Sequence, residues 1–289
     1  MATKLQLAGS PMRQHLDSKR GGVFTERDLQ QMLHENRREW GLGTRVAGPA
    51  FAKFLVEALG LRVVELRAEK YGTIRRYGWG EFSPHLMALS IRPQGYLSHG
   101  TAVFLHALND QIPKTIYVNR EQSEKPRGKG LTQERLTAAF ARRQRVSNYV
   151  YAFDSHRVVL LSGKQTGAYG VVTRLGPQGE QLPVTDIART LVDIAVRPAY
   201  SGGIIQVLEA YRGARGKAKG SDIVRVLKRL NYVYPYHQAI GFLMERGGFP
   251  SEECEKLKSL GAEFDFFLLY GTKNSKYDER WRLFHPEGL

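Results

Sequence analysis

Few side chains in this sequence have the type and spacing of a catalytic centre. Asp154, Ser155 and His156 are contiguous, but the members of a catalytic triad meet in space, and a three-residue turn cannot align them. Asp154, a following strand and Lys164 are faintly similar to a carboxylate–lysine metal nuclease. However, no acidic residue stands one or two positions before a lysine on that strand. We therefore interpret the stretch as a core strand and expect no catalytic residues.

The other candidate ligands do not form a site either. The segment GKQTGAYG (163–170) lacks the GxxxxGK[ST] spacing, so it indicates a turn and not a phosphate cradle. The eight histidines are scattered and include no close metal-binding pair. The single cysteine, Cys254, excludes a disulfide framework, and its context SEECEKLKSLG indicates an ordinary thiol on a helix surface. We expect no enzyme activity, no metal and no cofactor.

Basic residues, in contrast, are abundant. The chain has 43 Lys and Arg against 28 Asp and Glu, a net charge of +15, which favours nucleic acid or another polyanion as a partner. A soluble protein that is merely basic is the alternative. The excess is +6 in residues 1–80 and +9 in the remainder, so it is not confined to one tail. The sequence has neither an apolar run of the ~18 residues that a membrane span needs nor a signal peptide, and we expect a cytoplasmic protein with no membrane partner.

The first eighty residues predict the elements that would position part of this charge. The pattern indicates a helix at 10–20, a short extended piece, a helix capped by Thr25, a helix from near Thr44, and two alternating strands joined by a turn. This is the order of a winged helix-turn-helix. We predict such a DNA-binding domain at 1–80, whose second long helix enters the major groove while the hairpin contacts the backbone. The alternative is a winged helix that packs only against protein. The predicted contacts are Thr44, Arg45, Lys53, Arg67, Lys70, Arg75 and Arg76.

The rest of the chain predicts a larger mixed domain at 96–289, after a less periodic linker at 81–95. Strand patterns at 114–122, at 148–163 around the Asp154–His156 turn, and at 169–185 precede a helical region that starts at Asp186. Two apolar runs near the end indicate final strands. Strands and helices occur in blocks, so we expect an α+β fold and not a repeating βαβ sheet.

A series of residues in this second domain carries a family resemblance. In order, they are Arg189-Thr190-Leu191 with Asp193, Arg197-Pro198, Gly202-Gly203, and YPYHQAIGF at 234–242. With YLSHGTAVFLHAL at 96–108, this order resembles the C-terminal antitoxin domain of the AbiEi family, the antitoxins of abortive-infection type IV toxin–antitoxin systems. The resemblance covers most of 96–249. It departs at TDIARTL, where the family often has a Ser-Pro-Glu-type cap.

The resemblance implies two functions in phage defence. The winged domain would bind inverted repeats in its own double-stranded promoter DNA and repress its operon, with the C-terminal domain contributing to DNA binding or cooperativity. The C-terminal domain would counteract a cognate nucleotidyltransferase toxin, in several family members without a stable complex. Two alternatives stay open. One is a winged-helix regulator without a toxin, whose C-terminal half dimerises or senses an effector. The other is a nucleic-acid-processing enzyme.

Packing and capping explain most of the antitoxin-domain signature at the level of sequence. Arg189 and Asp193, four apart, can pair on one face of a helix. The glycines at 202–203 would permit close approach at a helix start. Tyr236 is expected to pack inward behind the Tyr-Pro turn. His237 is the signature residue with the weakest structural explanation, and no catalytic role is expected for it.

Overall fold

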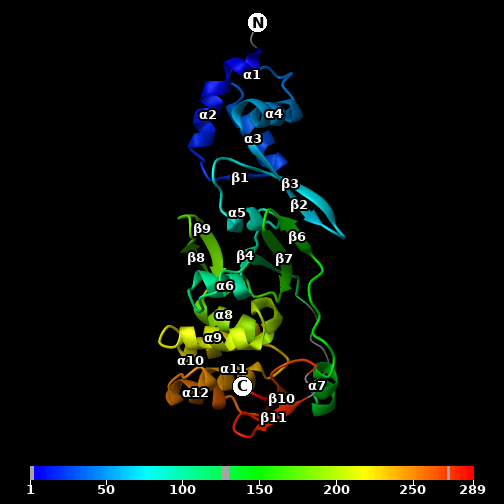
Figure 1. Cartoon of the computed structure of the whole chain (residues 1–289), viewed down its shortest axis with the longest axis vertical. Coiled ribbons are helices and arrows are strands. Elements are labelled where there is room, and N and C mark those ends of the chain that lie inside the picture. Colours follow the sequence, from blue (N-terminus) through cyan, green and yellow to red (C-terminus); the bar gives the residue numbers. More distant parts are fainter. Residues whose placement is uncertain (1–2, 125–129, 272–273) are drawn as a thin grey trace. The chain divides into compact units, whose positions relative to one another are not determined.

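The computed structural model describes residues 3–124, 130–271 and 274–289, and it has a mixed α+β fold (Figure 1). Within these residues, nine strands join in one mixed sheet in the order β1-β3-β2-β6-β7-β5-β4-β9-β8, and three more form a small sheet in the order β10-β12-β11. The chain divides into two compact units. The first combines residues 1–93 with 149–158 and 175–182, and the second contains the rest.

The first unit begins with helices that enclose a core of their own. They are α1 (Lys4–Leu7), α2 (Gly9–Asp17), α3 (Glu26–Asn36) and α4 (Gly48–Phe54), which continues as a π-helical turn, η1 (Leu55–Leu59). The predicted cap of α3 is confirmed. The Thr25 hydroxyl accepts from the Asp28 backbone N–H (3.1 Å), and the Asp28 carboxylate accepts from the Thr25 N–H (2.7 Å). The core between these helices contains Met12, Leu16, Leu29, Met32, Leu33, Trp40, Phe51 and Leu55.

Four strands complete the first unit: β1 (Val23–Phe24), β2 (Arg62–Ala68), β3 (Gly72–Gly78) and β6 (Val150–Phe153). The central pair is the antiparallel hairpin β2–β3. On one side β3 pairs with β1, and on the other side β2 pairs with β6 through Arg67 and Ala152. The hairpin therefore has a strand neighbour on each edge. The unit also contains α5 (Pro84–Leu89), which lies in the segment 81–95 that was expected to link two domains.

The second unit contains β4 (Tyr96–Leu97) and β5 (Thr115–Glu121), with most of β7 (His156–Gly163), β8 (Val171–Leu175) and β9 (Gln181–Thr185). Pairing is antiparallel between β4 and β5 and parallel between β4 and β9. The small sheet is formed by β10 (Phe266–Phe267), β11 (Ser275–Asp278) and β12 (Leu283–Pro286).

Helices build the main core of the second unit. They are α6 (His99–Leu105), α7 (Gln133–Phe140), α8 (Ile187–Val196), α9 (Ile204–Ala214), α10 (Gly220–Leu230), α11 (Tyr236–Arg246) and α12 (Ser251–Lys258), with a 3-10 turn, η2 (Pro198–Ser201), after α8. From Arg189 to Val196, every residue of α8 is buried. This helix is therefore central to the packing of the unit. The core includes Val103, Leu191, Ile194, Val207, Tyr211, Ile223, Ile240 and Leu243.

Cys254 on α12 differs from the sequence expectation. The helix is present, but the side chain is buried and not on the surface. Burial raises the pKa of its thiol to about 11, so it is protonated at neutral pH.

None of the helices formed by the described residues is both long enough and apolar enough to cross a membrane.

Candidate nucleic-acid interface

The turn between α3 and α4 presents two of the predicted contacts. Thr44 and Arg45 are exposed in this turn. The Arg37 guanidinium donates to the carbonyl oxygens of Gly43 (2.5 Å) and Val46 (2.9 Å), one on each side of the exposed pair. These two bonds hold the backbone of the turn in one shape, so the positions of Thr44 and Arg45 are fixed from within the unit.

Helix α4 begins later than the sequence pattern suggested. It starts at Gly48 and not near Thr44, and Pro49 lies in its first turn, where the fixed φ of proline favours a helix start. Lys53 is on the exposed side of α4, with its ammonium 3.8 Å from the carboxylate of Glu57 and the two side chains 71% and 65% exposed. Such an exposed pair contributes less than about 1 kcal/mol, so Lys53 can exchange Glu57 for another anion at little cost.

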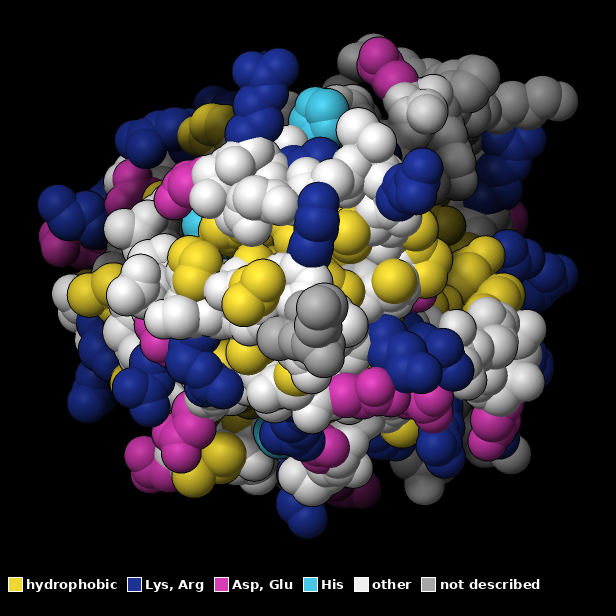
Figure 2. Space-filling view, turned by 90° about the horizontal axis from the view of Figure 1, so that it is seen from above, with side chains coloured by type: hydrophobic (Ala, Val, Ile, Leu, Met, Phe, Trp, Pro, Cys, Tyr) yellow, Lys and Arg dark blue, Asp and Glu magenta, His cyan; other side chains and the backbone are white. Residues whose placement is uncertain are grey.

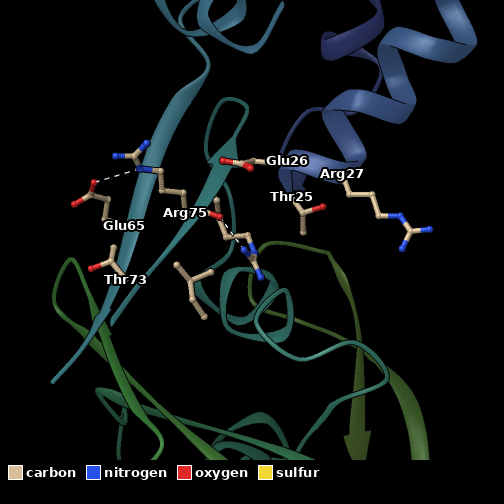
Figure 3. Close-up of a pocket in the computed structure, with 8 residues that line it drawn as sticks. Thr25, Glu26, Arg27, Glu65, Thr73 and Arg75 are labelled. Atoms are coloured by element: carbon tan, nitrogen blue, oxygen red, sulfur yellow. Dashed lines mark hydrogen bonds and ion pairs between the residues drawn. The ribbon is translucent and has the colours of Figure 1, made fainter. Parts of the chain in front are cut away.

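Arg67 and Arg75 share one face of the β2–β3 hairpin with Glu65 between them. The Glu65 carboxylate is 3.0 Å from the Arg67 guanidinium and 3.6 Å from that of Arg75, whose side chains are 75% and 63% exposed. Figure 3 shows Arg75 and Glu65 in the wall of a groove of about 780 Å³, which is also lined by residues 25–27 at the start of α3. Lys70 is exposed at the hairpin tip. Three predicted contacts on the hairpin are thus accessible to a ligand.

Arg76 lies on the opposite face of the hairpin. It stands across from Val64, whose side chain is buried. The Arg76 guanidinium donates to the carbonyl oxygen of Ser90 (2.9 Å) and to its hydroxyl (3.1 Å), at the end of α5. These bonds use most of the Arg76 N–H donors inside the unit, although the side chain also lines the groove beside Arg75. The phosphate contact predicted for Arg76 stays a prediction, and a structural role is the competing interpretation.

Charge alone does not outline an interface. In the view of Figure 2, most Lys and Arg side chains lie toward the edge of the face with acidic side chains among them, and a few lie among the hydrophobic side chains nearer the centre. The described residues on this face are therefore of mixed charge. The case for a binding surface depends on where particular basic residues are held and not on the total of +15.

In the second unit, the expected ion pair between Arg189 and Asp193 is present and buried. Arg189 Nε donates to Asp193 Oδ1 at 2.9 Å, and the two side chains are only 2% and 5% exposed. Arg189 also donates to the Tyr169 carbonyl oxygen (2.8 Å) and the Tyr96 hydroxyl (3.4 Å). Burial raises the pKa of Asp193 despite the opposing effect of Arg189. The pair joins α8 to the segments around it.

Close approach explains only one of the glycines at 202–203, since a Cβ on Gly202 would lie 3.0 Å from Gln206 Cγ. Gly202 and Gly203 have φ of +81° and +90°, a region that residues with a Cβ adopt only with strain. A Cβ on Gly203 would have no atom within 4 Å, so close approach is not the reason for glycine there. Arg197 caps the end of α8, and its guanidinium donates to the Arg145 carbonyl oxygen (3.0 Å).

The start of α11 is explained by packing. Tyr236 is buried, with its hydroxyl 3.5 Å from that of Tyr270. His237 Nε2 lies 2.6 Å from the Gly261 carbonyl oxygen, and burial lowers the pKa of its ring. His237 thus has the structural partner that the sequence did not reveal. The sequence reading also missed Gly241, where a Cβ would lie 2.1 Å from the Trp281 ring.

The residues considered for catalysis have other partners. Asp154 forms an ion pair with Arg62 (2.8 Å), and Lys164 donates to the Asn231 carbonyl oxygen (2.5 Å). In the part of the chain that the structure describes, no three His, Cys, Asp or Glu side chains are grouped so that they could hold a metal ion.

Comparison with known proteins gives a fold relationship. No protein-family model matches the chain, and no curated protein does. Among solved structures, the chain is similar to the crystal structure of the RV2827C protein from Mycobacterium tuberculosis, with a TM-score of 0.61 and 16% sequence identity. The match covers 96% of this chain and 90% of that one. At this identity the match shows a shared fold, over nearly the whole chain.

Proposed function

We propose that the chain is a DNA-binding antitoxin, which represses its own toxin–antitoxin operon and counteracts a nucleotidyltransferase toxin. The observation that carries the DNA-binding half is the order α2-β1-α3-α4-β2-β3 together with the pairing of β1 with β3. This connectivity supports a winged helix-turn-helix, in which α4 would be the recognition helix and β2–β3 the wing.

The accessible side chains on these elements support that assignment. Thr44, Arg45 and Lys53 lie on the turn before α4 and on its exposed side, where base edges and flanking phosphates would be met in a major groove. Arg67 and Arg75 on the wing have guanidinium groups that suit bidentate contact with phosphate. Phosphate contacts position the protein, so α4 and its preceding turn would read the sequence.

The antitoxin half of the proposal rests on the resemblance of 96–249 to the AbiEi antitoxin domain. Its signature residues Arg189, Asp193 and Tyr236 are buried in the second unit, and His237 is held by the Gly261 carbonyl. Their chemistry supports maintenance of the fold. A surface that acts against the toxin would then consist of other residues, and the signature would mark the scaffold on which that surface is built.

A gel shift of the full chain on the DNA upstream of its own gene tests the repressor half. Labelled upstream DNA would compete with a scrambled DNA of equal length and composition. We expect shifts that resist the scrambled competitor and appear in pairs, one for each repeat of an inverted pair. Equal binding to both DNAs would reduce the interaction to general polyanion affinity and contradict the proposal.

Co-expression tests the antitoxin half and separates it from a regulator without a toxin. A nucleotidyltransferase encoded beside this gene should arrest growth when expressed alone, and the intact chain should relieve the arrest. An Arg75→Ala chain should still relieve it, because Arg75 belongs to the wing. If neither chain relieves the arrest while the upstream DNA is bound specifically, the regulator without a toxin replaces the antitoxin.

A further inference from the structure

We infer that the DNA-binding surface extends past the wing onto the hairpin β6–β7, with Arg157 as an additional phosphate contact. The inference rests on the proposed winged-helix function, and it adds to it a segment from the middle of the chain. In sequence, Arg157 is about ninety residues from the wing and no motif connects the two. Residues 149–158 nevertheless belong to the first unit.

Strand pairing places Arg157 on the same face as Arg67. Arg67 stands directly across from Ala152 on β6, so these side chains share a face. A two-residue turn joins β6 to β7, and the Phe153 and His156 rings stack at 5.5 Å across it. The Phe153 and His156 side chains therefore share one face of the β6–β7 hairpin. Ala152 and Arg157 are each one residue farther from the turn. Because side chains alternate along a strand, these two lie on the other face. Both are exposed.

The result is a row of side chains across four strands: Thr73, Arg67, Ala152 and Arg157. None of the four is acidic. Arg67 and Arg157 are two strand spacings apart, about 10 Å, so they would contact different phosphates. Ala152 stands between them and has a side chain short enough to let a DNA backbone approach the sheet. Arg157 has no recorded ion pair among the described residues, whereas Arg67 has Glu65.

The same hairpin region also holds the wing in place. Tyr149, directly before β6, stacks on Tyr71 at the wing tip with ring centroids 4.2 Å apart and planes 16° from parallel. The β2–β6 backbone pairing adds a second attachment on the wing's edge. These two attachments hold the wing against β6, and holding two arginines in place lowers the entropic cost of contacting two phosphates together.

Salt-dependent binding of the intact chain to its upstream DNA tests the inference. Dissociation constants would be measured over a range of NaCl concentrations for the wild type and for Arg157→Ala, Arg157→Lys, Arg67→Ala and Arg67→Ala/Arg157→Ala. Arg225→Ala is the matched control, because Arg225 is an exposed arginine of the second unit, 3.2 Å from Asp222. Thermal unfolding of each variant would show that the fold is intact.

We expect Arg157→Ala to weaken binding about 5-fold and to lower the slope of log K against log salt by about 1, because one phosphate contact is lost. Arg157→Lys should restore most of the slope, and the double variant should lower it by about 2. If Arg157→Ala leaves the salt slope unchanged, as Arg225→Ala should, while Arg67→Ala lowers it, the wing contacts DNA but the β6–β7 hairpin does not. That result would overturn the inference. If the wild type does not prefer the upstream DNA, the proposed function itself fails.

Discussion

The two units each contain an arginine–carboxylate pair of nearly the same length in very different surroundings. Arg67 and Glu65 are 3.0 Å apart with side chains 75% and 36% exposed, and Arg189 and Asp193 are 2.9 Å apart with side chains 2% and 5% exposed. Water screens the first pair, so it stabilises the fold little and can be exchanged for a ligand. The second pair has been removed from water, and each charge depends on the other. Burial, and not distance, separates a surface for binding from a structural link.

Removing one partner of the buried pair should have the largest effect on stability. Arg189→Ala leaves Asp193 buried without its counter-ion, and we expect the free energy of unfolding to fall by about 3–5 kcal/mol. Urea denaturation would measure this loss. Arg225→Ala, which removes one partner of an exposed pair, is the control, and its free energy of unfolding should fall by about 0.5 kcal/mol or less. Equal losses in the two variants would contradict the contrast between the units.

A buried histidine beside this pair predicts a pH dependence. Burial, together with the charges of Arg189 and Arg197, lowers the pKa of His99 to about 3. The unfolded chain takes up a proton near pH 6.5 and the folded chain does not, so His99 destabilises the fold as pH falls below 6.5. Between pH 6.5 and 5 we expect it to cost about 1.5 kcal/mol.

The check is urea denaturation of wild type and His99→Asn at both pH values. Asparagine tolerates the positive φ of +52° at this position and does not titrate. The variant should lose about 1.5 kcal/mol less than the wild type over this interval. Identical pH dependence in the two chains would show that the pKa of His99 is the same in the folded and unfolded states.

Arg75 and Arg76 are adjacent in sequence but lie on opposite faces of the hairpin, so they test the same contrast within the first unit. Arg76→Ala removes the hydrogen bonds to Ser90, and we expect the free energy of unfolding to fall by about 1–2 kcal/mol. The salt slope of DNA binding should be unchanged, since Arg76 lies on the face opposite Arg75. A lower salt slope with an unchanged free energy of unfolding would show that Arg76 contacts DNA.

Arg75→Ala should have the smallest effect on stability and the opposite pattern. Its pair with Glu65 is exposed, so the free energy of unfolding should change by about 0.5 kcal/mol or less. The salt slope of DNA binding should fall by about 1. If Arg75→Ala lowers the free energy of unfolding and leaves the salt slope unchanged, Arg75 has the structural role expected for Arg76.

Much of the secondary structure could be predicted because its signals are local. The Thr25 cap, the alternating strands and the blocks of helices all appear close to where the sequence placed them. Pro49 marks the true start of α4, and giving more weight to proline in the first helical turn would have corrected the boundary near Thr44. Alternation along β3 also separates Arg75 from Arg76, and a register that places Arg76 across from Val64 would have identified the half-buried one.

The rest depends on contacts between distant segments, which have no local signal. Arg67 pairs with Ala152 across an interval of 85 residues that contains parts of the second unit. Nothing near either residue specifies that register, so the pairing of β2 with β6 could not be predicted from the sequence. For the same reason, the burial of Cys254 and the contact of His237 with Gly261 could not be predicted from the helices that contain them.

The insertion of 149–158 and 175–182 into the first unit also sets the order in which the chain can fold during synthesis. When residue 80 leaves the ribosome, the wing still lacks the strand that covers its edge and the ring that stacks on its tip. Those segments follow about 70 to 100 residues later, after part of the second unit has been made, and such distant contacts form slowly. A prematurely terminated chain would therefore have an incomplete first unit. Under the proposed function, repression would require synthesis to proceed well into the second unit of the same molecule.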